Sequence, residues 1–125
     1  MYRVCVRRDF IAQHFLVGGD WGAENQLHSH HYVLELELAG ETLDRHKYLV
    51  DILDIESHLN AQIGYYRDQT LNDKPEFKDA NPSLESFARI LCEALSAGIL
   101  APNIRLVTTR LWENENAWAG YSMER

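Results

Sequence analysis

The sequence predicts an α+β fold in which one antiparallel sheet carries two helices on a single face. Three observations support this prediction. Segments near both ends of the chain alternate apolar and polar residues, which is the period of a half-buried strand. Two central segments instead repeat apolar residues every three or four positions, as amphipathic helices do. Short turns join neighbouring strand segments into hairpins, and hairpin strands pair antiparallel.

The first predicted strand covers residues 2–16. Phe10, Ala12 and His14 share one of its faces, because residues two apart on a strand point to the same side. A glycine-rich segment at residues 18–20 then breaks the alternation and separates this strand from the next.

The second predicted strand covers residues 28–38 and has one apolar and one acidic face. The apolar face consists of Tyr32, Leu34, Leu36 and Leu38. Gly40 ends this strand. Residues 47–51, KYLVD, alternate again and are therefore predicted to form the return strand of a hairpin.

The period changes after this segment, and an amphipathic helix is predicted from Ile52 to Ile63. Gly64 is predicted to lie at or near its end, because glycine commonly follows the last turn of a helix. Residues 66–81 contain several Asn, Asp and Pro residues, so they are predicted to be an irregular loop.

A second helix follows, and its apolar stripe consists of Leu84, Phe87, Ala88, Leu91 and Leu95. Either Asn81 or Ser83 is predicted to cap its start, and Gly98 to mark its end. Two further strands are predicted at residues 103–113 and 118–123, joined by a short turn. Such a sheet leaves the face without helices open, and other copies of the chain would cover it.

Composition describes a folded, acidic, single-domain protein. The chain has 125 residues and a net charge of −7, which argues against nucleic acid or an anionic membrane as its main partner. It has no apolar run long enough to span a membrane and no signal-like start. Cys5 and Cys92 form no disulfide framework, so a reduced, cytoplasmic location is predicted.

Histidines provide the first candidate site. His28 and His30 lie two apart on a predicted strand, so both side chains can reach one metal ion, while His31 points the other way. His14, on a different strand, is the candidate third ligand. Three neutral histidines with an open fourth position would form a catalytic zinc site. The alternative is that six histidines in this chain include a near pair by chance.

Glu113 is the second candidate, because it ends an apolar strand where an unpaired carboxylate would be costly if buried. A carboxylate there can accept two parallel hydrogen bonds from a guanidine-like ring edge, such as that of a pterin or guanine. The alternative is an exposed glutamate at a strand end. On their own, Glu24, Arg67 and Asp68 resemble ordinary loop charges.

Five segments together resemble the 6-pyruvoyltetrahydropterin and 6-carboxytetrahydropterin synthase family. In order they are FIAQH, HSHHY, YLVDILDIESHLN, LNDKPEF with NPSLESFA, and LWENENAWAGY. HSHHY is similar to the family's HGHNY segment, with Ser29 for Gly and His31 for Asn. The last segment is similar to the strand whose glutamate anchors the pterin, which places that role on Glu113, although Asn114 replaces the usual threonine.

The resemblance implies the tunnelling fold, with four antiparallel strands and two helices. It implies a hexamer built from two trimers, with active sites at subunit interfaces. His14, His28 and His30 would hold Zn²⁺, and the zinc would bind the hydroxyls of the substrate's C6 side chain and acidify a neighbouring C–H. Ser83 and Glu85, at a helix start, would support the pocket.

The sequence departs from the family at its proton relay. Glu24 occupies the position of the family's catalytic cysteine, and Arg67 and Asp68 occupy the positions of its Asp-His pair. A branch of the family carries this glutamate and cleaves 7,8-dihydroneopterin triphosphate to 6-hydroxymethyl-7,8-dihydropterin. Glu24 is therefore the candidate base, Asp68 a secondary acid or base, and Arg67 either the ion-pair partner of Asp68 or a phosphate contact.

The resemblance thus predicts a zinc-dependent lyase that acts on the side chain of 7,8-dihydroneopterin triphosphate. Two alternatives remain open. One is a related enzyme with a different heterocycle as substrate. The other is a pterin- or purine-binding protein that has lost catalysis together with the family's cysteine and histidine.

Overall fold

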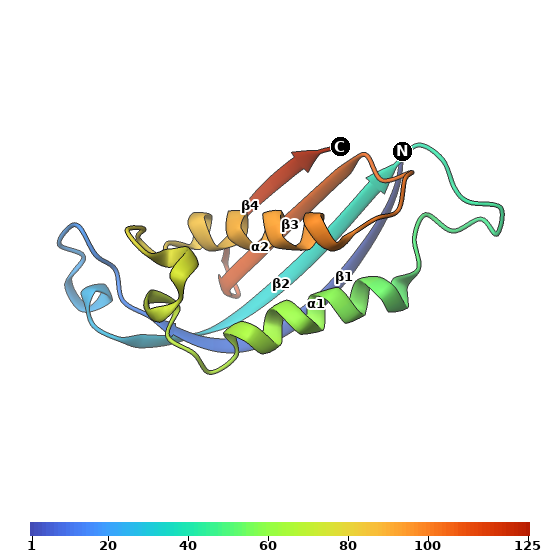
Figure 1. Ribbon diagram of the computed structural model, residues 1–125. Coiled ribbons are helices and arrows are strands. Elements are labelled where there is room, and N and C mark those ends of the chain that lie inside the picture. The colour runs from blue at the N-terminus through green and yellow to red at the C-terminus, as the bar shows by residue number, and fades with distance from the viewer.

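The computed structural model describes all of residues 1–125 and contains one sheet with two helices on one face (Figure 1). The elements are β1 (Tyr2–His14), β2 (His28–Gly40), α1 (Ile52–Tyr66), α2 (Leu84–Gly98), β3 (Leu106–Asn114) and β4 (Ala117–Glu124). The strands lie in the order β1-β2-β3-β4, and each neighbouring pair is antiparallel. This confirms the predicted α+β fold with a four-stranded antiparallel sheet.

The hydrophobic core lies between the sheet and the two helices. The predicted apolar face of β2 is fully buried there, at Tyr32, Leu34, Leu36 and Leu38. Leucines at such positions each stabilise the fold by about 2 kcal/mol relative to an exposed position. On the opposite face, Glu35 and Glu37 are only half-buried, so this side of the sheet is open within a single chain.

A side chain caps the N-terminus of each helix. Asp51 accepts a hydrogen bond from the Leu53 amide, and Ser83 accepts one from the Ser86 amide at the start of α2. Ser83 rather than Asn81 is therefore the cap of α2. Neither helix is long and apolar enough to cross a membrane.

Helix α1 ends at Tyr66, so Gly64 lies in its last turn, near the end of the helix as predicted. The last turn is stabilised because Tyr66 is buried and its ring packs edge-on against Phe87, with 4.9 Å between ring centroids. Gly64 itself is exposed, and a side chain there would meet no neighbouring atom. The helix thus tolerates glycine in its last turn, where packing of Tyr66 stabilises the helix end.

The predicted return strand at residues 47–51 is wrong. Strand β2 pairs with β1 on one side and with β3 on the other, so it has no free edge for a further strand. The segment instead forms a turn in which Asp44 accepts hydrogen bonds from two backbone amides, and Lys47 has a φ of 70°. Its apolar residues Leu49 and Val50 are buried as part of the core.

The loop between α1 and α2 is ordered by two short 3-10 turns, Leu71–Asp73 and Pro75–Phe77. The side chain of Asn72 accepts a hydrogen bond from the Phe15 amide and donates one to the Phe15 carbonyl. These bonds replace strand pairing at Phe15, so β1 ends at His14, two residues before the predicted end. The loop is thereby attached to the chain directly beside His14.

Candidate metal centre and active site

Three histidines converge on the helix-facing side of the sheet, where β1 ends and β2 begins. In the antiparallel register His14 lies opposite His28, and His30 follows two residues along β2. The three ring centroids are 4.6 to 4.9 Å apart, so the rings share one space. His31 lies on the other face, where its Nε2 is 2.6 Å from a carboxylate oxygen of Asp9.

Backbone carbonyls orient two of these rings. Nδ1 of His14 lies 2.8 Å from the Pro82 carbonyl oxygen, and Nδ1 of His28 lies 2.7 Å from that of Gln26. Because a carbonyl oxygen only accepts hydrogen bonds, Nδ1 is the protonated nitrogen of each neutral ring. The Nε2 lone pairs then remain for a cation, which is the usual arrangement of metal-bound histidines.

His14 carries a buried nitrogen that nothing in the chain satisfies. Its Nε2 makes no hydrogen bond, and an unpaired buried polar atom costs about 1–3 kcal/mol. Burial lowers the pKa of His14 and outweighs the opposing effect of the Pro82 carbonyl, while His30 and His28 lower the pKa further. His14 is therefore neutral at pH 7, and a metal ion would satisfy its free nitrogen.

Glu24 adds a fourth donor to these three rings. Its Oε2 lies 2.8 Å from Nε2 of His28, and that nitrogen lies 3.2 Å from Nε2 of His30. One donor atom from each of these residues and from His14 lies within 4.8 Å of all the others. Electron-pair donors converge in this way around a cation. Imidazole and carboxylate donors suit zinc, so the residues fit the metal predicted from the sequence.

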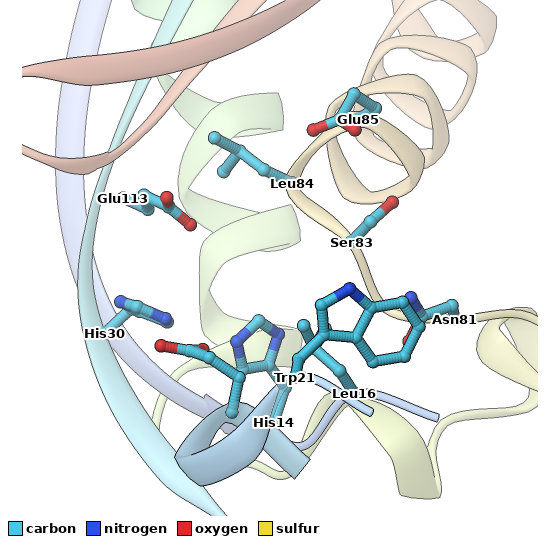
Figure 2. A pocket seen from close by; sticks show the side chains of 10 residues that line it. His14, Leu16, Trp21, His30, Asn81, Ser83, Leu84, Glu85 and Glu113 are labelled. Carbon is cyan, nitrogen blue, oxygen red and sulfur yellow. The ribbon is translucent and has the colours of Figure 1, made fainter. Parts of the chain in front are cut away.

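A cavity of about 410 Å³ opens beside this cluster (Figure 2). Its lining consists of His14, Leu16, Trp21, Glu24, His30, Asn81, Ser83, Leu84, Glu85 and Glu113. The volume lies in the range of small-molecule sites. Four of the six predicted catalytic and substrate-binding residues therefore line one cavity: Glu24, Ser83, Glu85 and Glu113.

The carboxylates of Glu113 and Glu85 reach the cavity from different elements. Glu113 comes from the end of β3, beside an irregularity in its pairing with β4, and Glu85 comes from the first turn of α2. In Figure 2 they lie on different sides of the cavity. Ser83 is also at the wall, but its hydroxyl already accepts the capping hydrogen bond of α2. The carboxylates therefore offer a ligand hydrogen-bond acceptors from different sides, and the Ser83 hydroxyl can still donate one hydrogen bond.

Arg67 and Asp68 lie outside this cavity. They follow the last turn of α1, where the Asp68 amide donates to the Ile11 carbonyl and Asp68 has a φ of 60°. Both side chains are exposed, and they form no ion pair with each other, so of the two roles expected for Arg67 the pairing with Asp68 is not formed within one chain. Within one chain neither residue lines the cavity or belongs to the four-donor cluster.

Two residues of the site were not singled out for function from the sequence. Tyr32 is buried beside the histidines, 5.6 Å from the His30 ring, and burial together with the charges of Glu113 and Glu24 raises its pKa. It continues the alternation of His28 and His30 on the same face, which is the signal that would have identified it. Trp21 lies in the loop before β2, where no periodic pattern marks it.

Comparison with solved structures places this fold among pterin synthases. A Plasmodium vivax 6-pyruvoyltetrahydropterin synthase with a mutated catalytic residue has 13% identity and a TM-score of 0.83, covering 99% of this chain and 98% of that one. The Caenorhabditis elegans enzyme has 20% identity and a TM-score of 0.77, covering 100% and 97%. A Wolinella succinogenes protein described as uncharacterized has 16% identity and a TM-score of 0.78, covering 98% of each.

Sequence comparison extends this likeness from the fold to the family. Among curated proteins, none matches this sequence. The model of the 6-pyruvoyl tetrahydropterin synthase family, however, matches residues 3–124, which is nearly the whole chain. The chain therefore belongs to the 6-pyruvoyl tetrahydropterin synthase family, whose members are lyase-type enzymes of pterin metabolism.

Proposed function

We propose that this protein is a zinc-dependent lyase that binds 7,8-dihydroneopterin triphosphate and breaks a bond in its C6 side chain. The observation that carries the proposal is the four-donor cluster of His14, Glu24, His28 and His30. Three of its members, His14, Glu24 and His30, line a cavity that Glu113 also lines. Family membership supports a pterin as the ligand of this cavity.

The charges of the cavity suggest how the substrate is oriented. Its lining includes Glu24, Glu85 and Glu113 but no lysine or arginine. A pterin ring presents an N–H and an amino group on one edge, and the Glu113 carboxylate can accept both hydrogen bonds. The triphosphate would be repelled by the three carboxylates, so we place it outside the cavity, toward solvent.

Glu24 is the proposed base. Zinc, when bound, would polarise the side-chain hydroxyls of the substrate and acidify a neighbouring C–H. The Glu24 carboxylate, 2.8 Å from a candidate metal ligand, would remove that proton. Loss of the triphosphate would follow from this C–H deprotonation. For carbon–carbon cleavage Glu24 would instead take the proton of the C2′ hydroxyl, whose oxygen becomes an aldehyde carbonyl as the C1′–C2′ bond breaks. The electron pair of that bond passes to the pterin ring, and reprotonation at C1′ gives 6-hydroxymethyl-7,8-dihydropterin. In the Plasmodium vivax enzyme a glutamate is described as a catalytic residue, which supports this role.

The test is to incubate the zinc-loaded protein with 7,8-dihydroneopterin triphosphate and identify products by mass spectrometry. We expect a pyruvoyl, carboxy or hydroxymethyl pterin, and the mass distinguishes them. Glu24→Gln should abolish turnover without loss of folding. Glu41→Gln, the same change at an exposed residue at the other end of β2, should leave turnover unchanged. Full activity in Glu24→Gln would refute the assigned base.

The alternative is a zinc- and pterin- or purine-binding protein without catalysis. The position of Asp68 favours it, because this residue lies outside the cavity, so within a single chain the expected second acid or base is not beside Glu24. It predicts pterin binding that depends on Glu113, with no product from any pterin triphosphate. The same incubation therefore decides between the two functions.

We further propose that the protein is a cytoplasmic homo-hexamer built from two trimers. The open face of the sheet and the outer edge of β4 are available for contacts between copies. An assembly would also give Arg67 and Asp68 access to the cavity of a neighbouring copy. Light scattering coupled to size-exclusion chromatography should give six times the 14.5 kDa chain mass. A monomer at micromolar concentration would refute the assembly.

A further inference from the structure

Trp21 is the largest apolar side chain of the cavity, and almost half of its surface is exposed. Its relative exposure is 47%, whereas the lining is otherwise mainly carboxylates, imidazoles and other polar groups. Figure 2 shows its indole across the cavity from Glu113. An exposed indole beside a cavity provides a flat apolar surface that a ligand can cover, with a gain from apolar burial.

Gly19 sets the position of this indole. A methyl group added at Gly19 would lie 2.6 Å from the Trp21 Cη2 atom and 3.0 Å from two further ring carbons. The indole therefore packs directly on the Gly19 backbone, which no residue with a Cβ permits without moving the ring. The φ of Gly19 is not in the left-handed region, unlike that of Gly18 or Gly22, so the ring contact and not the backbone requires glycine here.

Asn25 braces the loop that carries Trp21. Its amide nitrogen donates to the carbonyls of Leu16 and Gly19, and its amide oxygen accepts from the Trp21 backbone N–H at 2.7 Å. The Leu16 amide in turn donates to the Glu24 carbonyl. The indole and the Glu24 carboxylate are thus held by one hydrogen-bonded loop between β1 and β2.

We infer that Trp21 covers one face of the heterocycle bound in this cavity and selects flat aromatic ligands, with Asn25 as its positioning residue. This inference rests on the proposed function, because it takes a pterin as the ligand. Glu113 contacts only the edge of such a ring and would accept any guanidine-like group. Stacking of the Trp21 indole on the face of the ligand adds a preference for a planar ring, because two rings stack only when both are flat.

The experiment measures binding of neopterin to the zinc-loaded, full-length protein by isothermal titration calorimetry, with zinc content determined for each variant. Trp21→Ala should weaken binding about 10-fold, the effect typical for removing an aromatic side chain that stacks on a base. Gly19→Ala keeps the indole but displaces it, and should also weaken binding. Trp21→Phe should restore most of the loss. Tyr48→Ala removes an exposed aromatic ring at the other end of β2 and should have no effect.

Nuclear magnetic resonance adds a direct readout of the contact. The indole N–H signal of Trp21 should shift on addition of neopterin more than those of Trp112 and Trp118. Unchanged affinity in Trp21→Ala and Gly19→Ala, at full zinc content, would overturn this inference and leave the proposed function intact. If the wild-type protein does not bind neopterin at all, the proposed function is overturned and the inference with it.

Discussion

Replacing Asn25 with alanine tests whether the loop between β1 and β2 is held as one unit. The substitution removes two hydrogen bonds to backbone carbonyls, of 3.0 and 2.9 Å, and one from a backbone amide, of 2.7 Å. Asn25 is half-buried, so water can replace these partners only in part. We therefore expect the loop to open more often and Trp21 and Glu24 to lose their fixed positions.

The expected magnitude follows from the number of bonds. Each hydrogen bond contributes about 1 kcal/mol net, so the substitution destabilises the closed loop by on the order of 3 kcal/mol relative to the open loop. Each 1.4 kcal/mol is a factor of ten, so the local opening equilibrium should rise about 100-fold. The free energy of global unfolding should change less, because the short helical turn Gly22–Asn25 has no buried residue.

Hydrogen exchange of the Leu16 amide is the direct assay, because this amide bonds to the Glu24 carbonyl at 2.9 Å across the loop. In Asn25→Ala it should exchange about 100-fold faster than in the wild type. Asn103→Ala is the matched control, since that amide donates one hydrogen bond, to the Thr42 carbonyl, at the other end of the sheet. If the Leu16 amide exchanges at the same rate in Asn25→Ala as in the wild type, Asn25 does not hold the loop in place.

Two further predictions concern stability. Ser83→Ala removes the cap of α2 and should lower the free energy of unfolding by about 1 kcal/mol in urea denaturation, and an unchanged midpoint would contradict the cap. Tyr66→Phe removes a 2.7 Å hydrogen bond to Glu76 and should cost about 2 kcal/mol at pH 7. Burial alone raises the pKa of Glu76, but the hydroxyls of Tyr66 and Tyr65 overcome it and hold the pKa below its usual 4.5. A carboxyl group whose pKa is lower in the folded protein stabilises the fold at every pH above its pKa in the unfolded chain. This stabilisation is lost as the pH falls through the lower pKa of the folded protein. The difference between wild type and Tyr66→Phe should therefore shrink below about pH 4.5, and a difference that grows there would contradict this assignment.

Local periodicity predicted most of the fold because burial is periodic. The alternation in β2 marks the residues that face the helices, and the stripe of α2 marks its buried side. The predictions fail where contacts between distant parts of the chain determine the local structure. Residues 47–51 alternate like a strand, but both edges of β2 are already paired, so the segment forms a turn instead.

The candidate site was only partly predictable for the same reason. The spacing of His28 and His30 places them on one face whatever the register, whereas the approach of His14 depends on its pairing opposite His28. No sequence period applies to Trp21, because its position depends on loop hydrogen bonds. The role expected for Asp68 rests on the family resemblance alone, and this residue lies outside the cavity of its own chain.

Metal content of the purified protein is the most direct test of the central claim. Elemental analysis should find one zinc ion per chain, and His14→Ala, His28→Ala and His30→Ala should each lose it while remaining folded. His46→Ala, an exposed histidine in the loop after β2, should retain it. Stoichiometric zinc that depends on all three clustered histidines is the predicted result. Absence of metal from the wild type, or full metal content in all three variants, would contradict the account.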